Sequence, residues 1–355
     1  MQADAPEGIP AAERGHRTGR PARGPRPSTG PSLLSPGAAH DPYRLYRVLR
    51  EEYPLSYDAP LGAWLVSRYA DVATALTDPR FAGLPHDTAS RGGPAPLGLC
   101  HGSPLCAPRR HRTAAPGPVH PHRPDPGPVP RHTAARIERT AYVLARRIAG
   151  RRQADLVEEF CRWLPVGAIP GASARPHRPA GTGTGIVTGT AAAPCTRDTG
   201  LRERALASFL ANVLDAPDLL AALRVEPALT DRAWTESLRR DPPVQVVLRR
   251  TVTEVALSGG TLPAGAVVAC LTGAAGRDPE RFAAPDLFDP FRRDQGRSLT
   301  GPASCPAVLL GRLEARQGLG ALLDAMPRLR WADGFRPAGA GLLTRGPRAL
   351  LVRPC

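Results

Sequence analysis

The chain has 355 residues, enough for one large domain or two ordinary ones, and its 47 basic and 32 acidic residues give a net charge of +15. Every basic residue is an arginine, and proline, glycine and alanine are abundant, which indicates a GC-rich coding sequence rather than selection for a positive surface. The charge favours nucleic acid as a partner. However, no helix-turn-helix, zinc-finger or aromatic stacking pattern accompanies it, so nucleic-acid binding is the least favoured of three functional hypotheses.

The seven cysteines indicate a reducing, cytoplasmic environment, because their number is odd and their spacing is unpaired. Cys100 and Cys106 lie near His101 and His111, but this spacing matches no common zinc-ligand pattern. No stretch approaches the roughly 20 apolar residues that a membrane span requires. The first 37 residues also lack the apolar core of a signal peptide. We therefore expect no membrane association, and a disordered Arg/Pro/Gly-rich leader over residues 1–38.

Two stretches interrupt the regular patterns of the chain. From Ser103 to Arg136, proline recurs at nearly every third or fourth position, which rules out a regular helix. Gly171 to Arg197 has the same Arg/Pro/Ala/Gly/His/Thr composition, and its GTGTG run lacks the strand and lysine of a phosphate-binding loop. Both stretches look like a GC-rich gene read out of frame, which would arise from compensating frameshifts or gene decay. The alternative is genuine disordered insertion.

A helix is expected from about Asp231 to Arg240, stopped by Pro242 and Pro243 and followed by strands. Glu236 and Arg239 are three residues apart and therefore lie on one face of this helix. Taken alone, they form a solvated ion pair worth a few tenths of a kcal/mol.

Cys305 follows a Gly-Pro turn and directly precedes Pro306 and an apolar-striped helix. Pro306 fits the first helical position, where its missing N–H has no consequence. The helix dipole and the free amides favour a thiolate at this point, and such a thiolate can bind iron. For an isolated Cys-Pro pair, the alternative is a buried structural cysteine.

The ordered set of Glu236 and Arg239, a Pro-Val-Gln strand, FDPFR at 288–292, Cys305 and RLEA at 312–315 resembles the carboxy-terminal half of a bacterial cytochrome P450. Other segments look like further parts of that family: its opening helix, first strands and next helix (Asp41 to Phe81), two core helices (Ile137 to Ile169), and most of the long helix that crosses the haem (from Leu201).

This resemblance implies a mainly α-helical (α+β) fold with a small β-sheet beside the amino-terminal half. It implies one domain over residues 39–355, interrupted by the irregular stretches 103–136 and 171–197, with the lid helices largely missing. It also implies haem b, with Cys305 as the axial ligand of the iron. Electron donation from sulfur then favours O–O cleavage.

The resemblance also implies roles for two single arginines and for a triad of charged residues. Arg250 matches a position that pairs with a haem propionate, and the alternative is a solvent-facing strand arginine. Arg109 matches a second propionate position, where coincidence is the alternative. Glu236, Arg239 and Arg292 match a structural triad that ties the helix to the loop beneath the haem.

The proton-relay pair and the cysteine loop depart from the family pattern. Asp198 and Thr199 are the acid–alcohol pair in the long helix, two residues out of register, and a plain helix cap is the alternative. The approach to Cys305 lacks about three residues, including a phenylalanine. At four further positions the family prefers other residue types; this chain has Leu105, Ser298, Ala303 and Ala307 there.

The resemblance adds two hypotheses for the function to that of nucleic-acid binding. The first is a haem-thiolate monooxygenase that oxidises a small organic molecule of secondary metabolism with O₂ and electrons from a ferredoxin and its reductase. The second is a non-catalytic relative, either a P450-like auxiliary of a transferase or a decayed gene product. The retained Cys305 argues against a dedicated auxiliary, and the loss of the lid favours decay.

Overall fold

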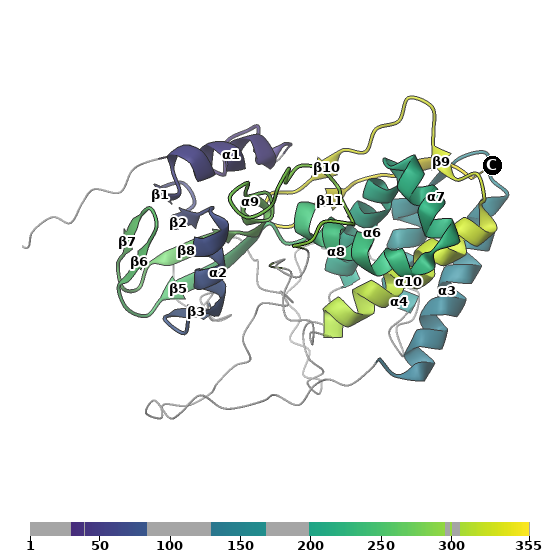
Figure 1. Ribbon diagram of the computed structural model, residues 1–355, viewed down its shortest axis with the longest axis horizontal. Coiled ribbons are helices and arrows are strands. Elements are labelled where there is room, and N and C mark those ends of the chain that lie inside the picture. Colours follow the sequence, from purple (N-terminus) through teal and green to yellow (C-terminus); the bar gives the residue numbers. More distant parts are fainter. Residues whose placement is uncertain are drawn as a thin grey trace, which may run out of the picture.

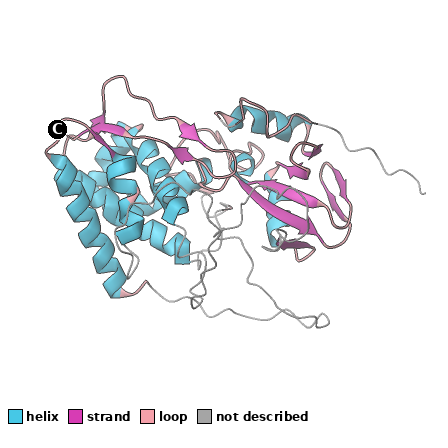
Figure 2. Ribbon diagram, turned by 180° about the vertical axis from the view of Figure 1, so that it is seen from behind, coloured by secondary structure: helices cyan, strands magenta, loops and turns pink. Residues whose placement is uncertain are grey.

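The computed structural model describes residues 30–38, 40–83, 129–167, 199–294, 299 and 306–354. Strands gather on one side of the molecule and helices on the other, as Figures 1 and 2 show from opposite sides. The strand-rich part comes mostly from the amino-terminal residues and from residues 246–275, so segments distant in sequence meet there.

The main sheet has five strands in the order β1-β2-β8-β5-β3. Its strands are β1 (Leu55–Asp58), β2 (Ala63–Val66), β8 (Val267–Leu271), β5 (Val246–Thr251) and β3 (Phe81–Gly83). Only β2 and β8 run parallel, with Trp64 opposite Val268. This pairing brings residues from the first fifth of the chain next to residues from its last third.

Side chains alternate between the two faces of this sheet, as strand geometry requires. On β8, Val268 and Cys270 pack on the face covered by α2 (Tyr69–Thr77). Ala269 and Leu271 pack on the opposite face with Leu49 of α1 (Pro42–Glu52). Cys270 is a buried core residue, and burial raises the pKa of its thiol to about 12.

The helical part has its own apolar core. It contains α3 (Arg131–Ala149), the π-helical turn η2 (Val157–Cys161), α4 (Trp163–Gly167), α6 (Thr199–Leu214), α7 (Pro217–Val225), η3 (Pro227–Leu229), α8 (Thr230–Arg240) and α10 (Pro306–Ala325). Helix α10 packs along α3 and also contacts α6 and α8. Helix α6 is buried on nearly every side, which marks it as the central helix.

Short elements complete the described chain. Strands β4 (Ala154–Asp155), β12 (Leu351–Arg353) and β9 (Arg330–Trp331) form one small sheet. Strands β10 (Gly339–Ala340) and β11 (Gly346–Pro347) form a hairpin, as do β6 (Val255–Leu257) and β7 (Gly260–Leu262). Helix α9 (Thr272–Ala275) follows β8 directly.

Several predicted elements are confirmed. Residues 41–81 form a helix, strands and a helix, the segment after residue 230 is helical as far as Arg240, and β5 follows Pro242 and Pro243. The mixed α and β content also agrees with the predicted fold class. Of the two core helices expected after Ile137, α3 is continuous, whereas the second combines the π-helical η2 with α4.

Two boundaries differ from the prediction. Residues 131–136 were expected to be irregular, but they form the first turns of α3, because Pro130 is the last proline of that stretch and lies at the helix N-cap. Residues 30–38, expected in the disordered leader, pack on the sheet: Leu33 is fully buried and its N–H donates to Asp58. The irregular stretch 171–197 and the leader up to residue 29 lie outside the described residues.

Candidate functional site

The predicted Glu236–Arg239–Arg292 triad is present and buried. Arg239 donates from Nε and Nη2 to the two Glu236 carboxylate oxygens, both at 2.8 Å. Arg292 approaches the same carboxylate from the loop, with its Nε 3.0 Å from Oε1. All three side chains are at most 5% exposed, so this is not the solvated surface pair considered as an alternative.

The triad fixes the course of the segment between α9 and Arg292. The Arg239 guanidinium donates to the carbonyls of Gly276, Pro285 and Leu287 at 2.6–3.1 Å. A side chain at position 276 would collide with the Arg239 carbonyl, so glycine permits this close approach. One helix therefore holds a long irregular loop through charge-assisted hydrogen bonds.

A second polar network, which sequence reasoning missed, joins α1 to the end of α8. Asp241 accepts hydrogen bonds from Tyr43, Arg277 and Asn212 at 2.9, 2.6 and 3.1 Å. Burial alone would raise the pKa of Asp241, but the guanidinium groups of Arg277 and Arg240 lower it below its usual value. Arg277 also stacks on the Tyr43 ring, with the guanidinium carbon 3.4 Å from the ring centroid. The sequence offers no short-range signal for these contacts.

Arg250 lies on β5, opposite Ala82 of β3 and Val267 of β8. Its Nη1 donates to the Gly265 carbonyl at 2.8 Å, and the residue is half-buried. By strand alternation its side chain shares a face with Val246 and Leu248, two members of an apolar cluster that also includes Leu342 and Leu343. The structure therefore places a cationic side chain at the edge of an apolar face.

The helix predicted after Cys305 is confirmed, because α10 begins at Pro306. Thr199 is the first residue of α6 and is half-buried. The other predicted site residues, Cys305, Asp198 and Arg109, lie outside the described residues. The structure thus joins Glu236, Arg239 and Arg292, and it leaves Arg250 apart from them on β5.

A buried ion pair between α6 and α10 is a further feature that the sequence did not reveal. Arg202 donates from Nη1 to Glu314 Oε1, and the side chains are 4% and 1% exposed. Arg202 Nη2 also reaches the Pro165 carbonyl at 3.3 Å. Burial raises the pKa of Glu314 to about 7, despite the opposing effect of Arg202. This pair fixes the central helix against the helix that follows Cys305.

The pH dependence of stability should reflect Glu314. Its folded-state pKa lies above its usual value of 4.5, so its stabilising contribution is complete below about pH 4.5 and is lost as the pH rises through about 7. The free energy of unfolding, measured with urea, should fall between pH 5 and pH 8 in the native chain. This fall should exceed the fall in Glu314→Gln by on the order of 2–3 kcal/mol. Equal losses in both proteins would contradict this prediction.

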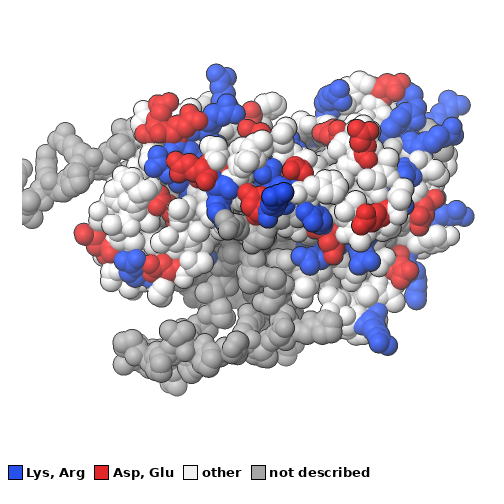
Figure 3. Space-filling model, viewed as in Figure 1, with Lys and Arg blue, Asp and Glu red and all other residues white. Residues whose placement is uncertain are grey.

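The described residues were also compared with the requirements of a nucleic-acid surface, a metal site and a membrane span. Arginines and acidic residues are interspersed over the face drawn in Figure 3, without a continuous basic stripe among the described residues there. Within the described ranges, no group of three His, Cys, Asp or Glu side chains is arranged to hold a metal ion. No single helix in the described part has the length and apolarity of a membrane span. Helices α6 and α7 reach that length and apolarity only together, across a bend of 103°.

Comparison with solved structures defines the class of fold. Substrate-free CYP109E1 from Bacillus megaterium superposes with a TM-score of 0.70 over 89% of this chain and 99% of that one, at 18% identity. P450BioI, solved with a fatty-acid-ligated acyl carrier protein, superposes with a TM-score of 0.65 over 88% and 98%, at 21% identity. At these identities the likeness establishes the fold alone, which is that of the cytochromes P450.

Sequence comparison shows similarity to one family over part of the chain. The family model "Cytochrome P450" matches residues 224–305. Pulcherriminic acid synthase of Bacillus subtilis is 32% identical over 162 residues (42% of this chain and 40% of the relative), and cytochrome P450 105C1 of a Streptomyces is 42% identical over 134 residues (36% and 34%). The chain thus spans only about a third to two fifths of the length of these relatives. This part of the chain is thus similar in sequence to bacterial cytochromes P450, and the described residues share their fold.

Proposed function

We propose that the chain is a haem-thiolate monooxygenase in which Cys305 is the axial ligand of the iron of haem b. The observation that carries the proposal is that α10 begins at Pro306, directly after Cys305. The amino-terminal end of a 20-residue helix stabilises negative charge and so favours the thiolate form of a cysteine beside it. The Cys305 thiolate is therefore a suitable axial ligand for haem iron.

The triad supports this assignment through the loop that it holds. Glu236, Arg239 and Arg292 hold the backbone between Gly276 and Arg292, which leads along the chain toward Cys305. We assign these three residues a structural role: the two arginines donate to Glu236 and to backbone carbonyls, and Glu236 also accepts from the Asp289 N–H. They hold the segment and take no part in the chemistry.

We assign Arg250 to one haem propionate. It occupies the edge of the apolar face formed by Val246, Leu248, Leu342 and Leu343, and a guanidinium binds a carboxylate there with paired N–H donors. The apolar face is suited to the body of an organic substrate. Arg109 is the second propionate candidate, on the sequence argument alone.

When bound, haem supplies the oxidation of the substrate by O₂. The roles proposed for the chain are to position the substrate, to exclude water and to deliver protons. Thr199, in the first turn of α6, and Asp198 before it are the proposed proton donors. The proposed electron source is a ferredoxin with its reductase.

We place the protein in the cytoplasm and in secondary metabolism, with one catalytic domain over residues 39–355. Support for the compartment comes from the unpaired cysteines, of which Cys161 and Cys270 are free and buried. Support for the metabolic role is limited to relatives such as pulcherriminic acid synthase, whose name states a biosynthetic activity for that protein.

A non-catalytic relative is the second candidate. The shortened approach between Leu299 and Cys305 and the two Pro-rich stretches favour it, because they alter the segments that would carry and cover haem. In this case the protein is an auxiliary or the product of a decayed gene.

Haem retention separates the two candidates. Full-length protein expressed with a haem precursor should purify with about one haem per chain by the pyridine haemochrome assay, whereas Cys305→Ser should lose most of it. Cys355→Ser, at the other end of the carboxy-terminal segment, is the matched control and should retain haem. A native protein that purifies folded and without haem would overturn the monooxygenase assignment and favour the auxiliary.

A further inference from the structure

The described chain has three clusters of buried apolar side chains, and each draws its buried members from one part of the molecule alone. The largest cluster, which includes Ile148, Phe209 and Leu319, comes from the helical part and the small sheet beside it. The other two lie on the two faces of the main sheet and include Val268 and Ala269. Apolar burial is the main stabilising term in folding. A region with its own apolar core can therefore open as a cooperative unit.

Polar contacts centred on Asp241 join the two parts. Asp241, at the end of α8, accepts from the Tyr43 hydroxyl of α1 at 2.9 Å and from Arg277, which follows α9, at 2.6 Å. It also accepts from the side-chain amide of Asn212 on α6 at 3.1 Å. One carboxylate thus holds elements of the strand-rich part against two helices of the helical part. These four residues are called the Asp241 latch below.

Two further connections cross between the parts. Arg239 of α8 donates to the Gly276 carbonyl at 2.6 Å. On the other side, the Leu343 carbonyl of the β10–β11 hairpin accepts from the Gln245 N–H at 2.8 Å. Leu342 and Leu343 also pack on the sheet, but both are only half-buried. Both connections therefore depend chiefly on hydrogen bonds to backbone carbonyls.

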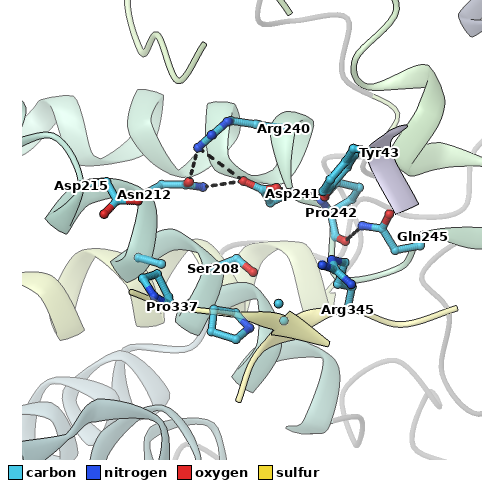
Figure 4. A pocket seen from close by; sticks show the side chains of 14 residues that line it. Tyr43, Ser208, Asn212, Asp215, Arg240, Asp241, Pro242, Gln245, Pro337 and Arg345 are labelled. Atoms are coloured by element: carbon cyan, nitrogen blue, oxygen red, sulfur yellow. Dashed lines mark hydrogen bonds and ion pairs between the residues drawn. The ribbon is translucent and has the colours of Figure 1, made fainter. Parts of the chain in front are cut away.

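A pocket of about 180 Å³ lies directly beside the latch. Tyr43, Asn212 and Asp241 line it, and the β10–β11 hairpin forms another wall. Figure 4 shows Asn212, Arg240 and Asp241 joined to one another along one wall. Protein interiors are close-packed, with few voids larger than a water molecule. The side chains of the two parts therefore do not interlock at this point, and the latch carries more of the connection between them.

We propose that the Asp241 latch joins two separately cored parts, and that the strand-rich part opens as one unit while the helical part stays folded. The strand-rich part opens first because each of its clusters contains fewer buried side chains than the helical cluster. Under the proposed function, opening would separate the haem contacts, since Cys305 precedes α10 and Arg250 lies on β5. The latch itself does not depend on that function.

Hydrogen exchange followed by mass spectrometry tests the proposal on the full-length protein, at a series of urea concentrations below the unfolding transition. Amides of β2, β5 and β8 should lose their protection together, at lower urea than amides of α3, α6 and α10. The measurement needs no haem, so its outcome is separate from that of the monooxygenase assignment. One shared urea dependence for both sets of amides would show a single cooperative unit and overturn the proposal.

Two substitutions in the helical part separate the latch from a general loss of stability. Asp241→Asn keeps the side-chain shape and removes the charge, so the amides of the main sheet should exchange about tenfold faster or more. Ile148→Val, in the helical core, should speed exchange in the helices and leave the sheet amides within about twofold of the native rate. Equal effects of both variants on the sheet amides would contradict the latch.

A milder variant covers the case in which Asp241→Asn does not fold. Tyr43→Phe removes only the α1 hydroxyl from the latch, and it should also speed exchange of the sheet amides. Its control is Tyr57→Phe on β1, since Tyr57 contacts Trp64 within the same sheet and takes no part in the latch. Sheet amides that respond no more to Tyr43→Phe than to Tyr57→Phe would overturn the proposal.

Discussion

Replacing Glu236 by leucine should lower the free energy of unfolding by about 3–5 kcal/mol, because two buried guanidinium groups would lose the carboxylate that they share. This loss is a large fraction of the 5–15 kcal/mol that stabilises an ordinary domain. Glu236→Gln keeps the shape and removes the charge, so it should also be clearly destabilised. Urea denaturation followed by circular dichroism measures both losses from the transition midpoints.

The control for this experiment is Glu280→Gln, since Glu280 is an exposed glutamate on the same irregular segment. Its effect should lie within about 0.5 kcal/mol of the native chain. If Glu236→Leu were as mild as the control, the carboxylate would not hold the segment, and the triad would lose its structural role.

Arg202→Met should lower the free energy of unfolding by about 3–5 kcal/mol at pH 8, because the buried Glu314 would lose its partner and would have to take up a proton or stay charged without it. At pH 5 the loss should be smaller, since the pKa of about 7 leaves Glu314 protonated there. The double variant Arg202→Met/Glu314→Leu should recover most of the stability, because apolar side chains often replace a buried ion pair without loss.

Comparing the single variants with the double variant gives the interaction free energy between Arg202 and Glu314. A double variant that loses the sum of both single effects would contradict a direct interaction between Arg202 and Glu314. The result bears on the fold because this pair links α6 to α10, the two helices on which the haem assignment depends.

Local chemistry in the sequence was sufficient to predict several parts of the fold. Pro306 indicated the start of α10, and Pro242 and Pro243 the end of α8, because proline excludes backbone hydrogen bonds at defined positions. Spacing by three residues predicted the Glu236–Arg239 contact. The family resemblance then supplied Arg292, which no local pattern links to that helix.

Long-range packing accounts for what the sequence did not predict. Arg202 and Glu314 are 112 positions apart, and only the packing of α6 on α10 brings them together. Leu33 lies in a Pro/Gly-rich segment whose composition indicated disorder, yet one apolar side chain and two hydrogen-bonding contacts with Asp58 suffice to pack it. The pocket between α6 and the β10–β11 hairpin joins segments more than 120 residues apart along the chain, so no sequence motif marks it.

The carbon monoxide difference spectrum of the reduced, purified full-length protein tests the central claim most directly. We predict the red-shifted Soret band of a thiolate-ligated haem in the native chain, and its absence in Cys305→Ser. A native protein that binds haem without this shift, or that keeps the shift after Cys305→Ser, would contradict the assignment of Cys305 as the iron ligand.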